Sequence, residues 1–328
     1  MKALAPSPDG TVLNDMKKCL IAYNPTAGRY PSRILVERAS RIFLEHDWDV
    51  QLKQSKSGEH ITRIAKQCAE EGYDYFIIAG GDGSINRAVE GLLGTQTALG
   101  VLPAGTSNVW AQEQGLPGLS WTRWMALEES ARRLADARVR LVDVGICNGR
   151  PFLLWSGIGL DGFVIHHIEP RKRWEKHFAL AQYATSVVWR AGFWRGMNLE
   201  VTADGRQISG HFLLALVSNV RLYAGGIAQI SPGARIDDGK MDLWLFEGEH
   251  LGDVVQLAWD VLSGSHTHSE KITQVIFREL ILESATPLYT QLDGEPEVWK
   301  DRVLVSVQPR LLRVLIPVNT PQPLFSHE

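Results

Sequence analysis

The residues best suited to chemistry are a glycine-rich segment, Gly80 to Asn86, with the sequence GGDGSIN. It lies between an apolar run that ends at Ala79 and a helical pattern that begins near Ser84. Glycines let a backbone approach an anion closely, and a helix N-terminus presents N–H groups and the positive end of its dipole. The segment therefore predicts a phosphate-binding turn. The alternative is a tight strand-to-helix turn that binds nothing.

Asp82 lies inside this predicted turn. A carboxylate beside phosphate requires a cation or a transferring proton to offset its charge, so Asp82 is a candidate for magnesium binding or base catalysis.

Two further segments end predicted strands and mix glycine with hydroxyl and amide side chains, which can bond phosphate oxygens. They are Asn24 to Gly28 (NPTAG) and Pro103 to Asn108 (PAGTSN). The chain has no GxxxxGK[ST] segment, so any nucleotide binding is not of the P-loop type.

A pair of acids, Asp293 and Glu295, flanks Gly294 near the end of the chain. Phosphoryl transfer to an alcohol needs a carboxylate that orients the hydroxyl or accepts its proton. The same segment is also a strong hairpin-turn signal, because Asp-Gly between two strand patterns is typical of tight turns.

The elements that position these residues change character along the chain. Residues 19–137 alternate short buried strands with amphipathic helices, which predicts a Rossmann-like parallel sheet that binds ligands beyond the carboxyl ends of its strands. Residues 138–317 show hairpin patterns and predict a β-rich, β-sandwich-like domain, with a helical insertion over Trp174 to Trp194. Its final strand is a candidate to return to the first domain. We expect a flexible tail at 1–18, a second tail at 318–328, and an active site in the interdomain cleft.

Composition narrows the class of protein. The chain has 328 residues with 34 basic and 37 acidic side chains, a net charge of −3 that argues against a nucleic-acid partner. No apolar run approaches the ~20 residues of a membrane span, and residues 1–18 lack the apolar core of a signal peptide. We therefore expect a cytoplasmic protein. A basic aromatic cluster around Arg171 to Phe178 is either a solvated helix face or a patch for anionic lipid at a membrane surface.

The order and spacing of NPTAG, GGDGSIN and PAGTSN resemble the three nucleotide-binding motifs of the diacylglycerol kinase catalytic family, which includes bacterial lipid kinases and sphingosine and ceramide kinases. Downstream segments, including Gly157 to Asp161, Asp238 to Asp242 and Leu292 to Glu295, are also similar to that family. The resemblance covers about Cys19 to Ile316.

The resemblance implies an ATP-dependent, magnesium-dependent kinase of a diacylglycerol-like or sphingoid lipid, with residues 138–317 as its lipid-binding domain. It implies that Glu295 is the general base with Asp293 beside it, and that Asp161 approaches the lipid hydroxyl. Arg235, Asp238 and Lys240 match a structural magnesium site. The residues that match ATP contacts are Asn24, Thr26, Gly28, Gly80, Gly81, Asp82, Gly83, Ser84, Ile85, Asn86 and Thr106.

Two alternatives stay open. GGDG also occurs in kinases of soluble substrates, such as NAD kinases and phosphofructokinases, although neither family has LDGE near its C-terminus after a hairpin-rich half. The family's aspartate after the asparagine of the third motif is Val109 here, which keeps open a catalytically silent lipid-binding or regulatory protein. The sequence identifies neither the lipid nor the oligomeric state.

Overall fold

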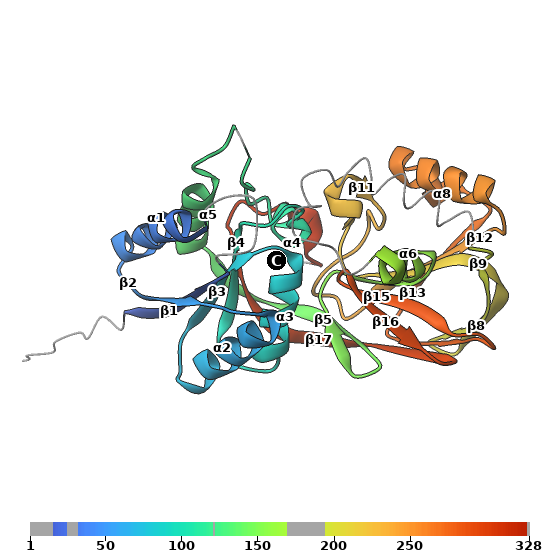
Figure 1. Cartoon of the computed structure of the whole chain (residues 1–328), viewed down its shortest axis with the longest axis horizontal. Helices are drawn as coiled ribbons and strands as arrows, with labels where there is room; N and C mark the ends of the chain where they lie inside the picture. The colour runs from blue at the N-terminus through green and yellow to red at the C-terminus, as the bar shows by residue number, and fades with distance from the viewer. Residues whose placement is uncertain (1–15, 25–31, 121, 169–193, 327–328) are drawn as a thin grey trace, which may run out of the picture.

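The computed structural model describes residues 16–24, 32–120, 122–168 and 194–326. They form two halves that lie side by side, joined by long strands that run through both (Figure 1). Each half has its own cluster of buried apolar side chains. The predicted fold class, a parallel-sheet domain with helices followed by a β-sandwich-like domain, is confirmed.

The first half is a parallel sheet in the order β4-β3-β1-β2, with helices in the connections. The strands β1, β3 and β4 are almost wholly buried because they are near-continuous apolar runs, as expected for a sheet covered on both faces. The bounds are β1 Lys17–Tyr23, α1 Ser32–Glu45, β2 Trp48–Gln54, α2 Gly58–Glu70, β3 Tyr75–Gly80, α3 Asp82–Leu92, β4 Ala98–Pro103, α4 Val109–Glu113 and α5 Ala126–Ala135.

The second half is built mainly from antiparallel pairs. Its long strand β9 connects several of these pairs, because its first residues pair with β8 and its last ones with β7 and β12. The bounds are β5 Arg138–Cys147, β6 Arg150–Phe152, β7 Trp155–Gly159, α6 Leu160–Ile168, β8 Met197–Ala203, β9 Arg206–Ser218, β10 Leu222–Tyr223, η2 Ala224–Gly226, β11 Ala228–Gln229, β12 Met241–Glu247, α8 Leu251–Ser263, η3 Ser265–His268, β13 Ile272–Phe277, β14 Glu279–Glu283, β15 Leu288–Leu292, β16 Glu295–Trp299, β17 Arg302–Ile316 and η4 Gln322–Leu324.

The last strand, β17, joins the two halves. Its first residues pair with β14 in the second half, and Val314 pairs in parallel with Leu99 of β4 in the first. A register shift between Gln308 and Leu312 bends the strand as it crosses, with Arg310 in the left-handed region at φ 50°. Beyond it, Leu324 is buried in the first core.

Several predicted features lie outside the described residues: Thr26, Gly28 and most of the helical insertion predicted over Trp174 to Trp194, with its basic aromatic cluster. Within the part of the chain that the structure describes, no helix is both long and apolar enough to cross a membrane.

Candidate functional site

The GGDGSIN segment joins β3 directly to α3. Helix α3 begins at Asp82, and no side chain of the described residues caps its N-terminus, so its first turn presents backbone N–H groups and the positive end of the helix dipole. The carboxyl ends of β1, β3 and β4 are adjacent, since Tyr23 pairs with Ala79 and Gly80 with Pro103. Asn24 and the other two loops therefore follow the same edge of the sheet.

Backbone contact between the second and third loops explains their glycines. The N–H groups of Ala104 and Gly105 both donate to the carbonyl oxygen of Gly80, each at 3.1 Å. A β-carbon on Gly105 would lie 2.4 Å from the α-carbon of Gly81, so no larger residue fits there without moving one loop. Thr106 lies exposed beyond this contact.

Asp82 fastens the same two loops through its side chain. Its two carboxylate oxygens accept hydrogen bonds from the N–H groups of Val109 (3.1 Å) and Trp110 (3.3 Å), at the start of α4. Burial raises the pKa of the Asp82 carboxyl, and these N–H groups oppose part of the rise. Asp82 thus positions the third loop, and its predicted role in magnesium binding or base catalysis stays a prediction.

Other predicted nucleotide residues differ in burial. Ile85 is buried beneath the loop. Asn86 is 3% exposed, and its amide oxygen has no hydrogen-bond partner within the part of the chain that the structure describes. Gly83 is exposed, with open space where a β-carbon would stand.

The LDGE segment forms the hairpin turn between β15 and β16, as its local pattern predicts. Asp293 and Gly294 both have positive φ, 48° and 90°, and Leu292 pairs with Glu295. This is the geometry of a two-residue type I′ turn, in which Asp-Gly is a favoured pair.

The two acids of this turn have different surroundings, and Asp293 is the buried one. Its carboxylate accepts three backbone hydrogen bonds, from the N–H groups of Leu153 (2.7 Å), Leu154 (2.9 Å) and Trp155 (3.0 Å). Burial raises the pKa of Asp293 to about 7, although the three N–H groups oppose the rise. The charge of Asp82 adds a smaller contribution that also raises the pKa of Asp293.

Glu295 points instead toward cations. Its carboxylate lies 2.5 Å from the guanidinium of Arg87, on α3, and 3.5 Å from that of Arg150, on β6. The Glu295 side chain is 30% exposed. Arg87 also pairs with Glu90 at 3.2 Å, and Arg150 pairs with Glu297.

Sequence reasoning missed both arginines. Arg87 follows Asp82 by five residues, on a helix that begins at a predicted phosphate site. A basic side chain at that position could have been predicted to belong to the site. Arg150 carries no such signal, since it follows Asn-Gly and looks like an ordinary turn residue.

Asp161, at the start of α6, connects to the same turn through Gln291. The Gln291 amide nitrogen donates to the Asp161 carboxylate at 2.8 Å, and its amide oxygen accepts from the N–H of Gly294 at 2.7 Å. Tyr223 also hydrogen-bonds Asp161, and its ring packs edge-on against Trp155 at 5.4 Å between centroids. Burial raises the pKa of the Asp161 carboxyl, while Gln291 and Tyr223 oppose the rise. Gln291 and Tyr223 are further residues of the site that sequence reasoning missed.

Arg235, Asp238 and Lys240 lie together on the loop before β12. The Asp238 carboxylate accepts from the N–H of Lys240 at 3.0 Å, and Arg235 donates to the carbonyl oxygen of Pro323. Burial raises the pKa of Asp238, while the N–H group and the charge of Lys240 oppose the rise. A bound cation would favour the ionised form of this carboxyl in the same way.

The carboxylate of Asp143 holds this loop through backbone hydrogen bonds. It accepts from the N–H groups of Gly239 (2.6 Å) and Arg310 (2.8 Å), and burial raises its pKa to about 6. Among the described residues, no group of three or more histidine, cysteine or acidic side chains is placed to hold a metal. The predicted magnesium site thus depends on one carboxylate and backbone carbonyl oxygens, which are donors that magnesium accepts.

The structure therefore brings Asp82, Asp293, Glu295 and Asp161 to one junction, with Arg87 between the two halves. A second ion pair crosses the junction nearby: the buried carboxylate of Glu113, on α4, lies 2.8 Å from the guanidinium of Arg221. The predicted magnesium residues belong to a separate loop.

Comparisons with known proteins match two parts of the chain to two family models. Residues 18–147 match the family model of the diacylglycerol kinase catalytic domain, and residues 157–316 match that of the YegS C-terminal NAD kinase beta sandwich-like domain. A Bacillus subtilis protein named Diacylglycerol kinase is 27% identical over 282 residues, covering 85% of this chain and 90% of that protein. A Pseudomonas aeruginosa protein named Probable lipid kinase YegS-like is 29% identical over 262 residues, covering 79% and 82%. The crystal structure of a diacylglycerol kinase from Bacillus anthracis superposes with a TM-score of 0.71 at 20% identity, covering 93% of this chain and 98% of that one.

Proposed function

Because the chain belongs to the diacylglycerol kinase catalytic family, we propose that it is an ATP-dependent lipid kinase that phosphorylates a hydroxyl of a diacylglycerol-like or sphingoid lipid. The observation that carries the proposal is the 2.5 Å contact between Arg87 and Glu295. It joins the acid of the LDGE turn to the helix whose N-terminus forms the predicted phosphate site.

In this proposal the first half binds the nucleotide. The uncapped start of α3 and the loop beside it receive the phosphates, with Asn24, Thr26, Gly28 and Thr106 as further predicted contacts. Asp82 holds the third loop against the second through the N–H groups at the start of α4. A preformed anion site lowers the cost of bringing the transferable phosphoryl group into position.

Glu295 is the proposed general base. The lipid hydroxyl oxygen forms a bond to the γ-phosphorus of ATP, the bond from that phosphorus to the bridging oxygen breaks, and ADP leaves. The hydroxyl proton goes to the Glu295 carboxylate. Arg87 holds this carboxylate toward α3, and its guanidinium provides a positive charge close to the place where phosphoryl charge develops.

Asp293 and Asp161 have supporting roles in the proposal. Three backbone N–H groups surround Asp293, so it shapes the turn that carries Glu295. Asp161, bonded to Gln291 and Tyr223, is the proposed contact for the lipid hydroxyl.

Magnesium supplies charge neutralisation on the phosphates when it is bound with ATP. A separate magnesium site of structural type is proposed at Asp238 with the backbone carbonyls of Arg235 and Lys240. We further propose a cytoplasmic location with the lipid acceptor met at a membrane surface.

Transfer of radiolabelled phosphate from ATP tests the function. The purified protein with magnesium and lipid mixed micelles should label an organic-extractable lipid, and Glu295→Gln should not. NAD and fructose 6-phosphate serve as soluble acceptors in parallel. Labelling of a soluble acceptor alone would replace the proposal with a soluble-substrate kinase, and lipid binding without any transfer would indicate a catalytically silent lipid-binding protein.

A further inference from the structure

Helix α8 has two apolar faces. The inner face, with Val254, Leu257 and Val261, packs on the core of the second half. The outer face carries Val255, Trp259 and Leu262, which are 56%, 70% and 57% exposed. These three follow the i, i+4, i+7 spacing that places side chains on one stripe of a helix.

A helix on a protein surface normally turns polar residues outward, because exposed apolar area is costly in water. Here the outward stripe is as apolar as the inward one. Tryptophan is also the side chain suited to an apolar–aqueous boundary, since its large ring is apolar and its indole N–H is polar. A surface of this kind indicates that something apolar covers it during function.

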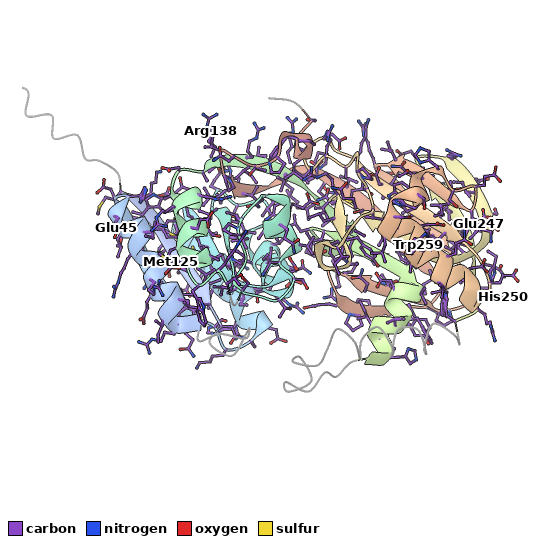
Figure 2. All side chains as sticks on the ribbon, turned by 90° about the horizontal axis from the view of Figure 1, so that it is seen from above. Glu45, Met125, Arg138, Glu247, His250 and Trp259 are labelled. Carbon is purple, nitrogen blue, oxygen red and sulfur yellow. The ribbon has the colours of Figure 1, made fainter. Side chains whose placement is uncertain are left out.

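The helix that carries this stripe lies close to the acceptor side of the proposed active site, which is formed by Asp161 and Tyr223. Helix α8 packs against β11, and Ile227, which lies between η2 and β11, is 67% exposed. The chain then leads back through η2 to Tyr223, which hydrogen-bonds Asp161. Figure 1 shows α8 and β11 along the same upper side of the molecule, and Figure 2 looks onto that side, with Trp259 labelled on α8.

We propose that the outer face of α8, with Ile227, docks on the surface of a lipid bilayer and delivers the membrane's lipid to the acceptor side of the active site. The inference rests on the proposed lipid-kinase function, which requires an acceptor that resides in a membrane. Ile227 directly precedes Ala228 of β11, and Ala228 pairs with Tyr223, which hydrogen-bonds Asp161. An exposed apolar side chain thus lies next to the acceptor residues, on the strand against which α8 packs, and this proximity favours a bilayer over another occupant.

The charged side chains of α8 indicate how the helix would bind a bilayer. Asp253 pairs with Lys271 at 3.0 Å, and Asp260 is the other charged side chain of the helix. An acidic helix gains nothing from anionic headgroups, so this face binds by inserting apolar side chains. Its contribution to binding should therefore persist at high ionic strength.

Vesicle binding in the absence of ATP tests the proposal. The probe is phosphatidylcholine vesicles containing diacylglycerol, measured by co-sedimentation. The double variant Trp259→Glu, Leu262→Glu should bind about tenfold more weakly or worse than the wild type, at low and high salt alike. Trp259→Phe, which keeps an aromatic ring, should retain most of the binding.

Leu304→Glu is the matched control. Leu304 is 43% exposed on β17, and in Figure 1 that strand runs along the lower side, away from α8. This variant should bind vesicles as the wild type does. All variants should keep the wild-type kcat on short-chain diacylglycerol dispersed in water, where no bilayer has to be reached.

Wild-type vesicle binding by the double variant would overturn the proposal, as would a wild type that does not bind vesicles. Light scattering that shows a wild-type dimer and a monomeric double variant, with vesicle binding unchanged, would assign the face to self-association instead. If the wild type phosphorylates no lipid in either form while the double variant still loses vesicle binding, the kinase proposal fails and bilayer docking is supported.

Discussion

The loops of the first half and the LDGE turn of the second half each contain an aspartate that backbone N–H groups surround. Asp82 accepts from two such groups and Asp293 from three. Glu295, two residues after Asp293, has arginine side chains as partners instead. Side-chain partners can move aside for a substrate more easily than backbone can. The two aspartates therefore hold their loops in place, and Glu295 is the carboxylate that is available for chemistry.

The largest expected effect is that of Glu295→Gln, which removes the proposed proton acceptor and keeps the side-chain shape. We expect kcat to fall by about 10²- to 10⁴-fold, with the KM for ATP and the melting temperature close to wild type. Glu279→Gln, at an exposed position on β14, is the control. A loss confined to the KM for ATP would make Glu295 a nucleotide contact.

Asp293→Asn should act on stability first. The amide offers one oxygen and an unwanted N–H₂ group to three backbone donors, so at least one buried donor loses its partner. We expect the free energy of unfolding to fall by about 1–3 kcal/mol at mildly acidic pH, measured by urea titration. Asp301→Asn, at an exposed position, should leave it unchanged. If Asp293→Asn left stability unchanged and lowered kcat as much as Glu295→Gln does, Asp293 would have a catalytic role rather than a structural one.

Arg87 tests whether the ion pair positions Glu295. Arg87→Ala should lower kcat by about tenfold, because the carboxylate loses the partner that holds it toward α3. Stability should change by less than ~1 kcal/mol, since both side chains are partly exposed, at 24% and 30%. Arg87→Lys keeps the charge and should recover part of kcat. Higher activity in Arg87→Ala would instead show that the ion pair inhibits Glu295.

Local sequence was sufficient for the loops and for the turn. The segments GGDGSIN and PAGTSN can be recognised from the sequence, because their glycines lie directly beside the strand and helix patterns that they connect. The Asp-Gly pair likewise predicts the type I′ turn at Asp293.

The partners of the carboxylates could not be predicted in the same way. Arg87 and Glu295 are 208 residues apart, and Leu153 and Asp293 are 140 apart. Which donor meets which acid depends on the pairing of β7 with β15 and on the packing of the second half against α3. No local pattern encodes those contacts.

The smallest expected effects are changes in the pH dependence of stability. They distinguish burial from hydrogen bonding as the cause of the pKa shifts of Asp253 and Asp293. Asp253, which is partly exposed at the start of α8, also accepts backbone hydrogen bonds, from the N–H groups of Glu249 and His250, both at 3.1 Å. With Lys271 beside it, these bonds lower its pKa from 3.8 to about 2. Asp293 has three such bonds, yet burial raises its pKa from 3.8 to about 7. Backbone N–H groups lower the pKa of both carboxyls. At Asp293 burial outweighs their effect, whereas at Asp253 burial opposes it only weakly.

The two acids should therefore give the stability opposite dependences on pH. Asp253, whose pKa is lowered on folding, stabilises the protein above about pH 4 and loses that contribution as pH falls toward 2. Asp253→Asn should then cost about 1 kcal/mol or less at neutral pH and nothing near pH 2. Asp293, whose pKa is raised, contributes most below about pH 4 and less as pH rises toward 7, so the cost of Asp293→Asn should shrink over that range. Urea unfolding of both variants across this pH range measures the two slopes. A cost of Asp293→Asn that grows toward pH 7 would mean that its three N–H groups outweigh burial, and Asp293 would then be an ionised carboxylate beside the active site.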